Sequence, residues 1–211
     1  MKKSVSVLGF VVGGFALILQ LYLILSNAYR YQINYASEVI RFFSYMTIWT
    51  NILVTLCFGS IVIFPKTKWS SYFSQPSVQA AAFIYILVVG VAYHFLLANV
   101  WSPTGLQYVA DILLHYGVPA LYILFWIFLA KKRFLSYKYS FTWLIYPFVY
   151  FIYSLIRGEI TSTYPYPFVD VNELGYPAVF ITSLILLVVY WGLGLLTIWG
   201  SRVLLKKRSL K

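Results

Sequence analysis

The chain has 211 residues, of which 62% are hydrophobic and only 10% are charged, and its formal net charge is +11. Soluble domains carry about 25% charged residues, so a chain this apolar is expected to have the lipid bilayer as its solvent. The composition therefore excludes an ordinary soluble enzyme.

Six apolar stretches are long enough to cross a membrane as helices, each of which needs roughly 20 residues. In chain order they cover residues 5–28, 43–64, 78–100, 108–130, 141–156 and 177–200. Their apolar runs are continuous and do not alternate with period two, which favours helices over a barrel. The first run is longer than the apolar part of a signal peptide, about 7–15 residues, so we expect it to be retained. We predict an all-α, polytopic membrane protein: a six-transmembrane-helix bundle with a single domain over residues 1–211.

The basic residues are distributed unequally between the two sides of this six-span arrangement. Only Arg30, Arg41 and Arg157 of the 16 fall on one side, and the rest fall on the side of the two termini. Basic residues accumulate on the cytoplasmic side of membrane proteins, so both termini are predicted to be cytoplasmic, in a bacterial plasma membrane. This distribution also accounts for the net charge without nucleic acid as a partner; the expected partners are membrane lipids.

Three potentially reactive side chains share one layer toward the outer leaflet. At a rise of about 1.5 Å per residue, Thr47 lies roughly 7 Å below the outer end of its helix, and His94 and His115 lie roughly 10 Å below theirs. Polar residues at such depth usually face the bundle interior or a wet cavity. We therefore expect Thr47 and His115 to face each other across a cavity open to the outer leaflet, with roughly 3–5 Å between their side chains.

Spacing along the helices adds a possible chemistry to this layer. Asp111 and His115 stand at i and i+4, so the carboxylate can fix which ring nitrogen carries the proton. Thr47, Thr50 and Asn51 stand at i, i+3 and i+4 on one face, where Thr50 or Asn51 could donate to an oxyanion. A hydroxyl opposite the imidazole would be an activated nucleophile. The pattern thus indicates a Thr–His–Asp acyl-transfer site, with no metal and no cofactor predicted.

Each of these residues also has a structural explanation. A membrane threonine usually bonds its own i−4 carbonyl, and a membrane histidine such as His94 is often an interhelical link. A metal site at the two histidines and Asp111 is another alternative, but no HExxH-type spacing supports it.

The fifth loop contains Arg157, Tyr164 and Tyr166 within a proline-rich segment. Proline fixes φ, and interfacial aromatic residues act as anchors, so the segment can be a rigid hairpin. It can also be a lid that helps to bind substrate, in which Arg157 holds an anionic head group or carboxylate.

Three segments resemble the bacterial relatives of the FAR/androgen-induced membrane protein family: FFSYMTIWTNIL at 42–53, DILLHYGVP at 111–119, and RG with YPYPF within 157–168. They occur in the same order, and the resemblance covers nearly the whole chain. The animal branch contains intramembrane threonine hydrolases that cleave fatty acid esters of hydroxy fatty acids. The resemblance implies that Thr47 is the nucleophile and His115 the base. Around Thr47 the animal pattern differs, and the resemblance assigns no role to Asp111.

Two hypotheses for function follow. The first is an intramembrane lipid ester hydrolase that acts on long-chain acyl esters through Thr47, His115 and Asp111. The alternative is a non-enzymatic lipid-binding, sensing or transport protein that uses the same cavity. A shared fold does not imply a shared reaction, so the resemblance alone does not decide between the two hypotheses.

Overall fold

The computed structural model describes residues 1–63 and 65–209, and every regular element in these residues is a helix. The predicted end of the second span at Phe64, and the terminal Lys211, lie outside the described residues. Five helical segments are long and apolar enough to cross a membrane: Lys2–Tyr31, Pro76–Leu97, Gly105–Leu129, Lys138–Thr161 and Val171–Lys206. A bent pair, Tyr35–Phe42 with Met46–Val62, adds a sixth if it forms one span. The prediction of an all-α membrane protein is confirmed, whereas the span count and the sidedness stay predictions.

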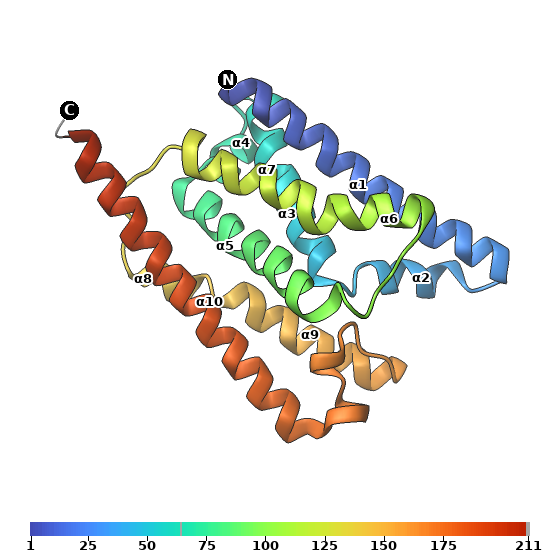
Figure 1. Ribbon diagram of the computed structural model, residues 1–211. Helices are drawn as coiled ribbons and strands as arrows, with labels where there is room; N and C mark the ends of the chain where they lie inside the picture. The colour runs from blue at the N-terminus through green and yellow to red at the C-terminus, as the bar shows by residue number, and fades with distance from the viewer. Residues whose placement is uncertain (64, 210–211) are drawn as a thin grey trace. The chain divides into compact units, whose positions relative to one another are not determined.

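Contacts divide the chain into two compact units, Met1–Lys131 and Lys132–Lys211, which are described separately. The first unit contains, in chain order, α1 (Lys2–Tyr31), α2 (Tyr35–Phe42), α3 (Met46–Val62), α4 (Lys68–Phe73), α5 (Pro76–Ala92), η1 (Tyr93–Leu97), α6 (Gly105–Ile112), η2 (Leu113–Gly117), α7 (Val118–Leu124) and η3 (Phe125–Leu129). Here α1 packs on α3 and α6, and α5 packs on α3 and α7 (Figure 1). The segments η1, η2 and η3 are single π-helical turns within longer helices.

Two glycines of α1 allow its close approach to α3. A Cβ atom at Gly13 would lie 2.3 Å from Thr55 Oγ1, and one at Gly9 would lie 2.4 Å from the Phe58 ring. Small residues are the usual means of close helix packing in membranes. Beside this contact, Ile48 of α3 and Leu114 of η2 belong to one buried apolar cluster with α1. This cluster fixes the beginning of α3 next to η2.

The helix breaks between α2 and α3, which meet at 69°. The Trp49 side chain donates through Nε1 to the Phe43 carbonyl (2.6 Å), and Ser44 Oγ donates to the Ile40 carbonyl (2.7 Å). Tyr45 is extended and precedes the first turn of α3. Side chains thus satisfy backbone groups that an uninterrupted helix would pair internally. The predicted span over residues 43–64 is therefore helical only from Met46 on, and Thr47 lies in the first turn of α3.

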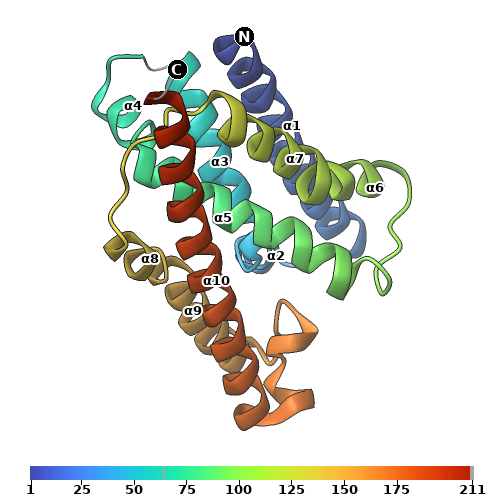
Figure 2. The same cartoon turned by 60° about the vertical axis from the view of Figure 1, so that its left-hand side comes forward.

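The second unit contains α8 (Lys138–Thr142), α9 (Ile145–Thr161), η4 (Pro167–Val169) and α10 (Val171–Ser209). The long helix α10 runs along α8 and α9 (Figure 2). It has non-helical backbone at Gly175, where φ is 74°, a conformation that strains any residue with a side chain. Arg202 of α10 binds the segment before α8: its Nε and Nη2 donate to the Leu135 carbonyl at 3.1 and 2.7 Å.

Candidate active site

Thr47 and His115 meet in the first unit. Thr47 Oγ1 lies 3.4 Å from His115 Nε2, which joins the first turn of α3 to η2. Thr47 is 8% exposed, and the His115 side chain is 14% exposed. The prediction of a Thr–His separation of roughly 3–5 Å is confirmed, whereas the cavity and its opening toward the outer leaflet stay predictions.

The far side of the imidazole is bound to Asp111. His115 Nδ1 lies 3.0 Å from the Asp111 carbonyl oxygen and 3.1 Å from its carboxylate Oδ1. Both atoms are hydrogen-bond acceptors, so the hydrogen bonds assign a proton to Nδ1. The lone pair of Nε2 then points at the Thr47 hydroxyl, as a general base requires. The predicted i, i+4 contact between Asp111 and His115 is confirmed.

Tyr93 completes the cluster, and no pattern in the sequence predicted its role. Its hydroxyl donates a hydrogen bond to Asp111 Oδ2, and its ring stacks on the His115 imidazole with 3.8 Å between centroids and 8° between planes. Tyr93 is 5% exposed. The chain contains 20 tyrosines, and no motif distinguishes this one.

Two π-helical turns position these side chains. Tyr93 begins η1, and His115 lies in η2, four residues after Asp111 in α6. π-Turns occur frequently at functional sites because they redirect side chains within an otherwise regular helix. The two turns approach closely because Gly90 precedes η1: a Cβ there would lie 3.2 Å from the His115 carbonyl oxygen.

Asn51 braces the site from within α3. Its Nδ2 donates to the Thr47 carbonyl at 2.8 Å and to the Leu114 carbonyl at 3.1 Å, which links α3 to η2. Both amide hydrogens are therefore used in this arrangement, and the donation from Asn51 to an oxyanion stays a prediction. Its Oδ1 is buried without a hydrogen-bond partner. Thr50, the other predicted oxyanion donor, is fully buried on the same helix.

His94 does not join the cluster in the way the shared depth suggested. It is exposed, and its Nδ1 lies 3.1 Å from the Tyr116 hydroxyl. Neighbouring residues on a helix point about 100° apart, so the inward position at this level is taken by Tyr93. The link through Tyr116 is an interhelical hydrogen bond, which was the structural alternative for His94.

The remaining predicted residues, Arg157, Tyr164 and Tyr166, belong to the second unit. Arg157 Nη1 donates to the Thr163 carbonyl at 2.6 Å, and the Tyr164 ring lies where a Cβ of Gly158 would be, at 2.0 Å. Burial, followed by the nearby carboxylates of Glu159 and Asp170, raises the pKa of Tyr164, so the phenol stays protonated.

Tyr166 stacks on Phe168, with 5.1 Å between ring centroids. These contacts of Arg157, Tyr164 and Tyr166 lie within the segment that joins α9 to α10, and the role of the three residues toward substrate stays a prediction.

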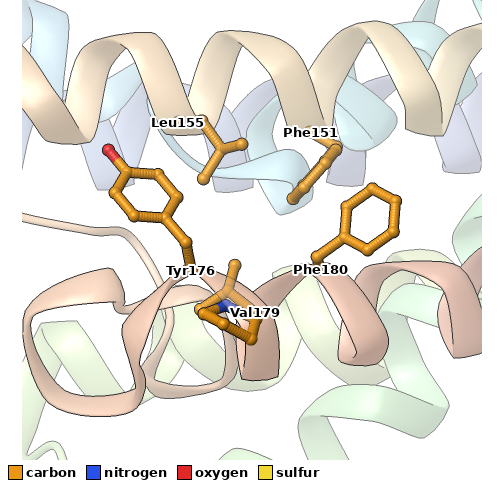
Figure 3. Close-up of a pocket in the computed structure, with 6 residues that line it drawn as sticks. Phe151, Leu155, Tyr176, Val179 and Phe180 are labelled. Atoms are coloured by element: carbon orange, nitrogen blue, oxygen red, sulfur yellow. The ribbon is translucent and has the colours of Figure 1, made fainter.

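The second unit also has an apolar cleft of about 310 Å³ between α9 and α10 (Figure 3). It is lined by Phe151, Leu155, Tyr176, Pro177, Val179 and Phe180. The only side-chain polar atom in this lining is the Tyr176 hydroxyl, which donates to Glu159 Oε2 at 2.8 Å. The cleft can hold an apolar chain, but its lining has no nucleophile–base pair.

No protein-family model, curated protein or solved structure matches this chain significantly. The fold and the apolar helices define it as a helical membrane protein, and further conclusions depend on the geometry of Thr47, His115, Asp111 and Tyr93.

Proposed function

We propose that this protein is a membrane-embedded hydrolase of lipid esters, in which Thr47 is the nucleophile. The observation that carries the proposal is the placement of Thr47 Oγ1 3.4 Å from His115 Nε2 while His115 Nδ1 is held by Asp111. This is the order of groups in a nucleophile–base–acid relay. The resemblance to the FAR/androgen-induced family supports the same two residues and an ester of a long-chain hydroxy fatty acid as substrate.

The first half of the reaction forms an acyl-enzyme. As Thr47 Oγ1 attacks the ester carbonyl carbon, its proton passes to His115 Nε2, and a tetrahedral intermediate forms. The C–O bond to the alcohol then breaks, and the imidazolium returns the proton to the leaving alkoxide. Asp111 stabilises the imidazolium while it exists and keeps Nδ1 as the protonated nitrogen.

The second half of the reaction releases the acid. Water attacks the Thr47 ester while His115 Nε2 takes its proton, and the proton returns to Thr47 Oγ1 as the acyl C–O bond breaks. The position of Thr47 in the first turn of α3 favours the oxyanion in both halves, because the N-terminal end of a helix carries partial positive charge.

The substrate would reach this site from the lipid phase. The excess of basic residues at both termini supports an N-in, C-in orientation in a bacterial plasma membrane, with the site toward the outer leaflet. A lipid-binding, sensing or transport role for the same residues is the competing function, and it requires no turnover.

Active-site labelling combined with an esterase assay tests the proposal. Purified protein in detergent is treated with a fluorophosphonate probe, and the intact mass is expected to show one adduct. Thr47→Ala should abolish the adduct and the hydrolysis of long-chain esters, and His115→Ala should lower the hydrolysis by about 100- to 10,000-fold. The double variant should be scarcely worse than either single one, because the two residues act as a unit. Thr47→Ser should retain part of the activity.

Matched controls come from the same residue types elsewhere in the chain. His94→Gln replaces an exposed histidine and Thr182→Ala a half-buried threonine of the second unit, and both should keep wild-type turnover. Equal turnover by wild type and Thr47→Ala would refute the assignment of the nucleophile. Tight lipid binding without turnover of any ester would favour the binding protein.

A further inference from the structure

The Asp111 carboxylate uses its two oxygens on two different partners. Oδ1 lies 3.1 Å from His115 Nδ1, and Oδ2 accepts from the Tyr93 hydroxyl. The Asp111 side chain is 6% exposed. A buried carboxylate is costly unless each oxygen finds a donor, and a hydrogen bond to a charged group is about twice as strong as a neutral one. Tyr93 therefore fixes the rotation of the carboxylate that presents Oδ1 to the imidazole.

The same tyrosine also restrains the imidazole. Its ring lies parallel to that of His115, at 8° and 3.8 Å between centroids, and it covers one face of the imidazole. Tyr93 comes from η1, whereas Asp111 and His115 come from α6 and η2, so the restraint is applied from a separate part of the fold. When the imidazole accepts a proton, the face of an aromatic ring stabilises the cation.

We propose that Tyr93 is a positioning residue that acts on His115 in two ways: its hydroxyl holds the Asp111 carboxylate on Nδ1, and its ring supports the imidazolium. The proposal deepens the hydrolase function and depends on it for its kinetic consequences. Tyr93 does not exchange a proton with the substrate in this scheme. A phenylalanine at position 93 would lack the hydroxyl that binds Asp111. A non-aromatic hydrogen-bond donor would lack the ring that stacks on His115.

Substitutions can separate the two contributions. Tyr93→Phe removes the hydroxyl and keeps the stack, and it should lower kcat by about 10- to 100-fold with KM unchanged. Tyr93→Leu removes both and should lower kcat further. Combining Tyr93→Phe with Asp111→Asn should cost little more than Asp111→Asn alone, because the hydroxyl acts through the carboxylate. Tyr108→Phe, which changes an exposed tyrosine of the same unit, is the control.

A spectroscopic measurement tests the positioning without any turnover. The chain has two histidines, so the His94→Gln variant leaves His115 as the single imidazole, and ¹⁵N-labelled histidine identifies its Nδ1 proton by NMR. This proton should resonate far downfield because a carboxylate shares it. Tyr93→Phe should move it upfield as the carboxylate turns away.

The two experiments distinguish failure of this inference from failure of the proposed function. An unchanged or further downfield Nδ1 proton in Tyr93→Phe would overturn the positioning role, even if the wild type hydrolyses esters. An upfield movement in a protein without esterase activity would support the positioning of His115 and reject the hydrolase. In an active enzyme, an unchanged kcat in Tyr93→Phe, or additive losses with Asp111→Asn, would also overturn the role.

Discussion

Replacement of Asn51 by leucine should impair catalysis far more than stability. Asn51 is fully buried, and its Nδ2 bridges the Thr47 and Leu114 carbonyls, which belong to a proposed catalytic residue and to the neighbour of His115. Leucine has the same branching at Cγ and a similar size. It can therefore fill the space while it removes the bridge between α3 and η2.

The effect on stability is the difference between two terms. Loss of two neutral hydrogen bonds costs about 0.5–1.5 kcal/mol each. The substitution also removes Asn51 Oδ1, which is buried without a partner. The desolvation cost of such an atom is about 1–3 kcal/mol. The two terms cover the same range, so the free energy of unfolding should change by about 2 kcal/mol or less, and Tm by about 8 °C or less.

The effect on catalysis has no such compensation. Without the bridge, Thr47 and His115 are held together only by the apolar contacts around them, and a displacement of about 1 Å lowers the rate by about 100-fold. Thermal unfolding followed by circular dichroism in detergent gives Tm, and long-chain ester hydrolysis gives kcat. Asn99→Leu, at an exposed asparagine of the same unit, should change neither. A drop in Tm of more than about 10 °C, or an unchanged kcat in Asn51→Leu, would show that the bridge does not have this role.

Two further predictions concern packing and sidedness. Gly13→Ala should destabilise the protein by about 1–3 kcal/mol because its Cβ would lie 2.3 Å from Thr55 Oγ1. Gly14→Ala is the control: its Cβ would have no atom within 4 Å, so the change should be neutral or slightly stabilising. Thermal unfolding of the two variants compares them. Cys57 is fully buried, so single cysteines introduced at the exposed Ser4 and Ser102 can be labelled separately in intact cells. A membrane-impermeant maleimide should label Ser102→Cys and not Ser4→Cys, and the opposite pattern would contradict the cytoplasmic N-terminus.

The proximity of Thr47 to His115 could be predicted from the sequence because each lies within a few residues of the same expected end of its helix. Matching depths along the helices predicted this contact even though α3 begins at Met46 and not near residue 42, and i, i+4 spacing predicted Asp111 beside His115. Both contacts are present in the structure. Height and spacing along one helix are properties of the local sequence, so no tertiary information was needed.

The direction in which each side chain points could not be predicted in the same way. A π-helical turn changes which side chain faces inward, and a hydropathy pattern carries no sign of one. The residue of η1 that contacts His115 is Tyr93, whereas its neighbour His94 is exposed and bonded to Tyr116. The break before Met46 was missed for a related reason, because it depends on hydrogen bonds from Ser44 and Trp49 to particular carbonyls.

A chain of hydrogen bonds inside a membrane protein can be structural or catalytic, and the contacts of this one differ along its length. At the Tyr93 end of this chain, Tyr93 and Asp111 are both 5% exposed. The two contacts from Asp111 to His115 Nδ1 are 3.0 and 3.1 Å long. At the other end, Thr47 Oγ1 and His115 Nε2 are 3.4 Å apart, and the His115 side chain is 14% exposed. A purely structural link between α3 and η2 gains most from a short, buried contact between the two elements, and here Asn51 supplies that contact at 3.1 Å. The Thr47–His115 contact is thus left long and partly accessible, as expected of a nucleophile and base that tighten only when a substrate is bound.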